Sequence, residues 1–440
     1  MPHLHITREL LWAVLRKEVS AEVLERAVVE ALADSCSFCR EEIAAWQRER
    51  RVSPTERAAL VRALPDLLDH RHQADASAAG IANRDLRKLL SLPLEKRLSK
   101  IERSVLRYRS PQLALLLLER CKQEMPADMR RAQELAKTAD AVLRRTPDGP
   151  EVSDLWARTA AYLGNAARYF DDLPEAERRF AFARSLVTTG GVTDPAVTAE
   201  IDSCEAMLFL ERSLFRRAET LLVRAITQYF LAGDLAEAAH PLVTLGLMYF
   251  HQGNLHKAIE STRLAADIVS PRRDLRLYVS ARFNLALFLW EAREHAAALE
   301  ILETDRKLFA KLKDSYTHLR IVWLRGRIEA GRGVMDEAER AYLEAREGFI
   351  RDRVAFDAAM VSLDLAILYG RQARWSEVRR LAGEMHKIFA AQAVHPEALA
   401  AVRLFQEAAQ QEKLTVARLE EIAEALKKAH WTPGEERPPR

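Results

Sequence analysis

The stretch YLGNAARYFDDLPEAERRFAFA, residues 162–183, contains the pattern that decides the fold. A small residue, Gly164, is followed twelve residues later by Ala176 and nineteen residues later by Ala183. The bulky Phe180 lies between the two alanines. This pattern predicts two antiparallel helices, because the small residue of the first helix allows the second helix to approach closely. The bulky residue is expected to fill the space between neighbouring pairs.

The same spacing recurs along the chain with a period of 40 to 42 residues. The first small residue of the successive repeats is Gly164, Ala206, Gly246, Ala286, Gly326 and Ala366. The next two positions of the pattern are Ala176, Ala218, Ala258, Ala298, Ala338 and Val378, then Ala183, Ala225, Ala265, Asp305, Ala345 and Met385. The slot between these two series contains Phe180, Leu222, Thr262, Leu302, Tyr342 and Ala382. A fixed period of this length predicts stacked helix pairs.

Two segments carry a resemblance to a known repeat. The first is Tyr162-Leu163-Gly164-Asn165 with Ala176, Phe180 and Ala183, and the second is Leu245-Gly246 with Tyr249, Gly253 and Ala258. Over about residues 151–390 the pattern resembles the tetratricopeptide repeat. The period exceeds the usual value of about 34 residues, as in long-helix members found in bacterial regulators. The resemblance implies an all-α, right-handed α–α superhelix over residues 110–430, followed by a disordered tail, 431–440.

Composition agrees with an all-α protein. Only 15 of 440 residues are glycine, and strong helix formers dominate.

The 67 basic and 64 acidic residues leave a net charge of +3, so nucleic acid and anionic membranes are not the expected partners. No apolar run approaches the ~20 residues of a membrane span. Four cysteines are too few for a disulfide framework. The expected location is the cytoplasm.

Turn residues predict several helix boundaries. Asp194-Pro195 and Ser270-Pro271 suit helix starts, since proline is tolerated in the first turn. Pro241 falls inside a first helix, where it is expected to kink or restart that helix. A degenerate leading repeat is expected over residues 110–145, and a trailing helical pair over 396–429.

Residues 1–50 have a different pattern and are expected to form a small helical module. Cys36-Ser37-Phe38-Cys39 places two thiolates where one tetrahedral zinc ion can take both, and His5 precedes them by 31 residues. The segment resembles the zinc-binding anti-sigma domain of bacteria. It departs from that domain at position 32, where Leu32 stands in place of the second histidine of the motif. The resemblance therefore implies either a zinc site of His5 (or His3), Cys36 and Cys39, or a helical module that has lost its metal.

Residues 51–109 are interpreted as a helical connector. Residues 73–83 are predicted to be a flexible linker, and residues 84–109 carry a local net charge of +6. This basic segment could bind an acidic partner or nucleic acid. The alternative is the solvated face of an amphipathic helix, whose apolar stripe would be Leu94, Leu98, Ile101 and Val105.

No catalytic motif is present. The sequence lacks a phosphate-binding Gly-x-x-x-x-Gly-Lys-Ser/Thr loop, a Gly-x-Ser-x-Gly elbow and a His-Glu-x-x-His pair. The chain is therefore expected to act by binding rather than as an enzyme, with no cofactor apart from the zinc considered above.

The tetratricopeptide resemblance implies that first helices line a concave groove. Its expected partner-binding residues are Asn165, Arg168, Phe250, Asn284, Trp290, Trp323 and Arg327. A groove that is aromatic at its centre and has arginines towards its ends suits a protein or peptide partner carrying acidic groups. The favoured function is a regulatory adaptor, in bacterial transcription or signalling control. The alternatives are a peptide-sensing regulator that uses the basic segment on nucleic acid, and an accessory subunit restraining an enzyme such as a protease.

Overall fold

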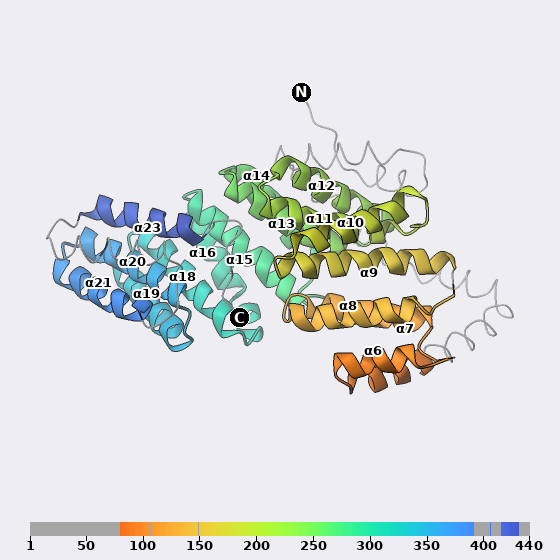
Figure 1. Cartoon of the computed structure of the whole chain (residues 1–440). Coiled ribbons are helices and arrows are strands. Elements are labelled where there is room, and N and C mark those ends of the chain that lie inside the picture. Colours follow the sequence, from red (N-terminus) through yellow and green to blue (C-terminus); the bar gives the residue numbers. More distant parts are fainter. Residues whose placement is uncertain (1–79, 106, 148, 391–404, 406–414, 431–440) are drawn as a thin grey trace, which may run out of the picture. The chain divides into compact units, whose positions relative to one another are not determined.

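The structure is a computed structural model that describes residues 80–105, 107–147, 149–390, 405 and 415–430 (Figure 1). All regular secondary structure within these ranges is helical. The chain divides into two compact units, residues 1–248 and residues 249–440. The predicted all-α fold is confirmed over the described parts of both units.

The first unit consists of helix pairs joined by short turns. After a helical segment at residues 80–90 come α6 (Leu94–Glu102), α7 (Pro111–Glu124), α8 (Met129–Leu143), α9 (Pro150–Tyr169), α10 (Leu173–Thr188), α11 (Pro195–Glu211), α12 (Phe215–Ala232) and α13 (Leu235–His251), whose last three residues, 249–251, belong to the second unit. Helices α7 and α8, α9 and α10, and α11 and α12 pack as pairs. The leading pair, α7 and α8, confirms the degenerate repeat expected at residues 110–145.

Polar caps and prolines set the helix starts in this unit. Asp172 accepts a hydrogen bond from the backbone N–H of Glu175 at the start of α10. Asp194 caps α11 in the same way, with Pro195 in the first turn as predicted. Such caps satisfy N–H groups that have no partner within the helix. The short local signals in the sequence therefore account for where these helices begin.

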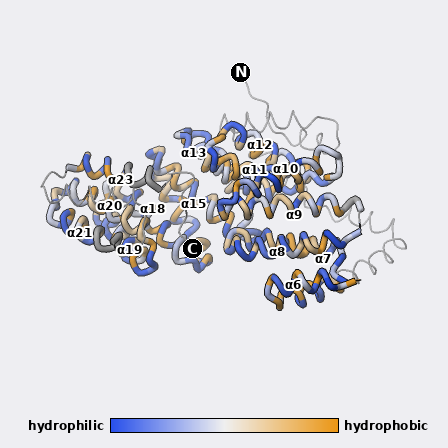
Figure 2. The backbone as a smooth tube through the Cα atoms, viewed as in Figure 1, coloured by the Kyte–Doolittle hydropathy of each residue, from blue (hydrophilic) through white to orange (hydrophobic). Residues whose placement is uncertain are grey.

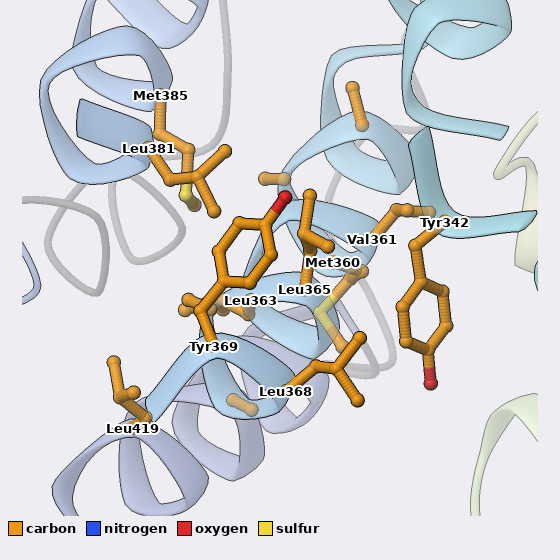
Figure 3. Close-up of a cluster of buried hydrophobic side chains, with 14 of the residues drawn as sticks. Tyr342, Met360, Val361, Leu363, Leu365, Leu368, Tyr369, Leu381, Met385 and Leu419 are labelled. Atoms are coloured by element: carbon orange, nitrogen blue, oxygen red, sulfur yellow. The ribbon is translucent and has the colours of Figure 1, made fainter. Parts of the chain in front are cut away.

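The second unit continues the helix pairs. Its helices are α14 (Leu255–Ile268), α15 (Leu275–Glu291), α16 (His295–Thr304), α17 (Arg306–Lys311), α18 (Ser315–Arg332), α19 (Met335–Arg351), α20 (Ala355–Arg371), α21 (Trp375–Ala390) and α23 (Val416–His430). Helix α20 lies at the centre of a core shared with α19, α21 and α23. Figure 3 shows Tyr369 of α20 among Leu381, Met385 and Leu419 from the two later helices.

The predicted register is confirmed by burial. All positions of the four series named above are buried, including every small residue of the first helices. In the first unit, Phe180 packs on Gly164 of its own helix pair: a Cβ on Gly164 would lie 3.1 Å from Cζ of Phe180. Phe180 therefore fills the space above the small residue within its own pair, and the expectation that the bulky residue fills the space between neighbouring pairs is wrong at this position.

Three local features differ from expectation. Helix α13 runs through Pro241 without restarting. Pro271 precedes α15 by a turn and does not start it; Asp274 caps this helix instead. At the small position occupied by Asp305, the second helix breaks into α16 and α17. The buried Asp305 carboxylate accepts hydrogen bonds from Tyr278 and Arg282 of α15, which explains why an acidic residue is tolerated there.

Several predictions fall on residues that the structure does not describe. The module at 1–50 with His5, Cys36 and Cys39, the whole segment 51–79 and the tail 431–440 lie outside the described residues. The predicted linker at 73–83 overlaps them, but its last four residues, 80–83, are helical. Within the described part, no helix is both long enough and apolar enough to cross a bilayer. Figure 2 shows hydrophilic and hydrophobic residues mixed along the labelled helices.

Candidate partner-binding site

The predicted partner-binding residues fall in both units. Asn165 and Arg168 belong to α9 of the first unit, whereas Phe250, Asn284, Trp290, Trp323 and Arg327 belong to the second. Of the five in the second unit, the structure brings Trp290, Trp323 and Arg327 into direct contact. These three side chains form the centre of the candidate site.

Arg327 contacts two indole rings. Its guanidinium carbon is 5.0 Å from the ring centroid of Trp290 on α15 and 4.3 Å from that of Trp323 on the same helix, α18. Arginine favours the face of tryptophan because the ring quadrupole attracts the cation. The indole N–H of Trp290 also donates a hydrogen bond to the backbone carbonyl of Arg327, at 3.1 Å. The two indoles are thereby held in one orientation while remaining partly exposed.

Asp364 of α20 completes this cluster and was not among the predicted residues. Its Oδ2 accepts hydrogen bonds from Nε1 of Trp323 at 2.6 Å and from Nε of Arg327 at 2.7 Å. Burial works against the charge of Arg327, but the carboxylate more than compensates, so the pKa of the guanidinium is raised above its ordinary value. Asp364 follows Asn284 by 80 residues, which is two repeat periods. The two residues therefore occupy equivalent positions in their repeats, and this equivalence is the sequence signal that could have identified Asp364.

Phe250 and Asn284 have different environments. The ring of Phe250 stacks on buried Phe288 of α15, with centroids 4.7 Å apart and an interplanar angle of 20°. Phe250 is therefore partly used in packing. Asn284 is only 6% exposed, yet its amide makes no hydrogen bond with a described residue. An amide that can both donate and accept suits the backbone of an extended peptide.

Asn165 and Arg168 bind each other. Oδ1 of Asn165 accepts from Nε and Nη2 of Arg168, at 3.1 and 2.9 Å. Arg168 also pairs with Glu211 of α11. The two residues predicted as one end of the groove thus form an internal polar cluster that links the first helices of adjacent repeats.

A second polar cluster in the first unit is centred on Glu200 of α11. Oε2 of Glu200 lies 2.7 Å from Nε of Arg158 and accepts a hydrogen bond from the hydroxyl of Tyr162 at 2.9 Å. Lys122 of α7 lies 3.0 Å from Oε1 of Glu200 and 2.7 Å from Oε2 of Glu237. Burial lowers the pKa of Lys122, but Glu200 and Glu237 outweigh it and the net shift is upward. Two cations and two carboxylates therefore balance within this cluster.

The two arginines expected to attract acidic groups, Arg168 and Arg327, are already paired, and so is Arg158 on α9. Arg158, Arg168 and Arg327 contact Glu200, Glu211 and Asp364 respectively. Their charges are largely compensated inside the chain.

The basic segment is also partly structural. Arg97 of α6 is buried and donates hydrogen bonds to the carbonyls of Leu89 and Leu92, at 3.2 and 3.0 Å, and to Oγ1 of Thr138 at 3.2 Å. Arg107 pairs with the buried Asp85. Of the residues in the expected apolar stripe, Ile101 is fully buried, whereas Val105 is 77% exposed and does not belong to the buried face.

No group of three or more histidine, cysteine or acidic residues is placed to hold a metal ion in the part of the chain described. The predicted zinc ligands belong to the undescribed residues. The two described cysteines, Cys121 and Cys204, have thiol pKa values raised to about 12 chiefly by burial, so neither is a reactive thiolate at neutral pH.

Comparison with known proteins supports the fold. No protein-family model matches the chain, and no curated protein matches it in sequence. The structure is similar to the crystal structure of a Rap protein complexed with Competence and Sporulation Factor, with a TM-score of 0.52 and 16% identity over 73% of this chain and 88% of that one. It is also similar to the apo form of RapI, with a TM-score of 0.55 and 12% identity over 72% and 97% of the two chains. These similarities confirm a tetratricopeptide-like helical-repeat fold.

Proposed function

We propose that this chain is a regulatory adaptor that binds a protein or peptide segment on the first-helix face of its second unit. The single observation that carries the proposal is the pair of partly exposed indoles, Trp290 and Trp323, which both contact Arg327. Aromatic residues and arginine dominate the binding energy of many interfaces. Fixing both rings in advance reduces the ordering cost of association.

The position of Asn284 and the fold comparison support the same function. Asn284 is on α15, the helix that also bears Trp290, and its amide is available for a ligand backbone. One of the similar structures is a Rap protein in complex with Competence and Sporulation Factor, so this fold accommodates a bound ligand in at least that protein. The proposed adaptor acts by binding and carries out no reaction of its own.

The test is a selection from a library of random 12-residue peptides against the full-length chain, followed by affinity measurement on individual synthetic peptides. Trp290→Ala and Trp323→Ala should each weaken binding by about 2 kcal/mol, or roughly thirtyfold. Phe182→Ala is the control, because Phe182 is a 44% exposed aromatic residue on a second helix, α10. Selection of no peptide by the wild type, or equal loss in the control, would overturn the proposal. Circular dichroism should show unchanged helix content in all three variants.

A further inference from the structure

Arg320 belongs to the same stripe of α18 as the Trp290–Arg327–Trp323 cluster. Arg320, Trp323 and Arg327 are separated by three and four residues, the spacing that places side chains on one face of a helix. Seven residues of helix correspond to about 10 Å along the axis. The second unit therefore presents two arginines on one face of one helix, two turns apart.

The Arg320 guanidinium is positioned by aromatic rings. Its central carbon lies 4.6 Å from the ring centroid of Phe283 on α15 and 5.8 Å from that of Tyr316 on α18. Phe283 is buried, and the arginine itself is partly buried. Stacking on ring faces restricts the side chain while leaving the N–H groups at the guanidinium edge directed away from the rings.

Arg320 has no carboxylate partner among the described residues, in contrast to the other covered arginines of this unit. Arg282 pairs with Asp305, Arg327 with Asp364 and Arg346 with Glu384. Each of these arginines keeps its charge beside an internal carboxylate, as expected for a guanidinium that is partly removed from water. Arg320 is desolvated on one side in the same way, but no carboxylate of a described residue balances its charge.

We propose that Arg320 is the subsite for a carboxylate of the bound segment, in a site whose neighbouring subsite, Trp290 and Trp323, takes an apolar or aromatic side chain. The inference rests on the proposed function and adds the chemistry of the partner. A guanidinium fork matches a carboxylate in a bidentate geometry. Arg327 cannot fulfil this role equally well, because Asp364 already occupies its Nε. The partner segment therefore carries an acidic group within about 10 Å of an apolar residue, because Arg320 and Trp323 lie one turn apart on α18.

The carboxylate can belong to an Asp or Glu side chain or to the C-terminus of the segment. The probes are 12-residue peptides selected by the full-length chain, resynthesised in three forms: unchanged, with Asp and Glu replaced by Asn and Gln, and with an amidated C-terminus. Fluorescence anisotropy measures the affinity of each form. Loss of affinity in the second form identifies a side-chain carboxylate, and loss in the third identifies the C-terminal one.

Arg320→Gln should reduce the affinity for the carboxylate form by about tenfold and leave the affinity for the matching amide form unchanged. Arg325→Gln is the matched control: Arg325 is exposed on the same helix, lies 3.3 Å from Glu303, and its replacement changes the net charge equally. Arg320→Lys should restore only part of the affinity, since an ammonium lacks the planar fork.

The possible failures separate the two proposals. Peptides that bind through Trp290 and Trp323 but show the same affinity in carboxylate and amide forms would overturn the role of Arg320 and leave the proposed function standing. Equal effects of Arg320→Gln and Arg325→Gln would also overturn it, because the effect would then be one of net charge. Absence of any peptide binding by the wild type would overturn the proposed function itself.

Discussion

The ring of Tyr342 lies directly on the backbone of Gly326. A Cβ atom added to Gly326 would lie 2.7 Å from Cδ1 and 2.8 Å from Cε1 of that ring, distances that packed side chains do not adopt. Tyr342 is buried and follows Gly326 by 16 residues, the same separation as between Gly164 and Phe180. The repeat pattern therefore records one physical contact, in which a bulky side chain of the second helix covers a bare position on the first.

Gly326→Ala should destabilise the protein by about 1 to 3 kcal/mol, because the added methyl group forces the Tyr342 ring or the helix pair to move. The measurement is chemical denaturation followed by circular dichroism. Gly383→Ala is the matched control, since it adds the same methyl group within α21, where nothing lies within 4 Å of it. Alanine should be stabilising there by about 0.5 to 1 kcal/mol. Equal effects at the two sites would contradict the packing argument.

Glu200→Gln should destabilise the first unit by about 2 to 3 kcal/mol, because the substitution leaves Arg158 and Lys122 with one carboxylate fewer. Glu177→Gln removes the same charge from an exposed pair with Arg212 and should cost less than about 1 kcal/mol. Urea denaturation of the two variants provides the comparison. If both lose the same stability, the polar cluster contributes no more than a surface ion pair.

Stability should fall at high pH because of Cys121 and Cys204. Their thiol pKa values are raised to about 12 by burial, whereas an unfolded thiol titrates near about 8.5. Between these values the unfolded chain releases the two protons and the folded chain retains them, so the free energy of unfolding decreases as pH rises. Burial of Tyr162 and Tyr229 shifts their pKa values in the same direction.

The contribution of the thiols is isolated by comparison with the double variant Cys121→Ala, Cys204→Ala. Denaturation at pH 8 and pH 10 should show a smaller loss of stability in the variant than in the wild type. The slope with pH is the relevant readout, because the substitutions also change packing. The same slope in both proteins would show that the two thiols titrate alike in the folded and unfolded chains.

Arg97→Ala should destabilise the protein by about 2 kcal/mol, since it leaves the carbonyl of Leu89 and the hydroxyl of Thr138 without this donor. Lys96→Ala is the control, because Lys96 is exposed on the same helix, α6. Thermal melting of both variants measures the difference. If Lys96→Ala lowers the melting temperature as much as Arg97→Ala does, the buried contacts of the arginine are not what stabilises the segment.

The zinc site at the N-terminus stays a prediction. If His5, Cys36 and Cys39 bind zinc, metal analysis of protein purified without chelator should find about one equivalent, and Cys36→Ser or Cys39→Ser should remove it. Cys121→Ser is the control, because burial keeps that thiol protonated and unsuited to metal binding. Protein without zinc would agree with the alternative, a helical module that has lost its metal.

The sequence by itself determined the helical class, the repeat register and several helix boundaries. Gly164, Ala176 and Phe180 specify a contact within one helix pair, and Asp194 with Pro195 specifies a helix start. These features are local or recur at a fixed spacing, so composition and periodicity are sufficient to find them. Two of the predicted site residues that meet, Trp323 and Arg327, lie four residues apart on one helix for the same reason.

Only the tertiary structure decided which charged groups are paired within the chain. Like Arg320, the residues Arg158, Arg168 and Arg327 lie on first helices, but each of these three pairs with a carboxylate from another helix, 37 to 43 residues distant in the chain. Whether two side chains at such a separation meet depends on the offset between neighbouring first helices, which periodicity does not fix. For the same reason, the role of Asp364 and the burial of Arg97 could not be predicted from the sequence. The charged residues on the first helices could thus be found in the sequence, whereas the partner of each one depends on the packing of one repeat on the next.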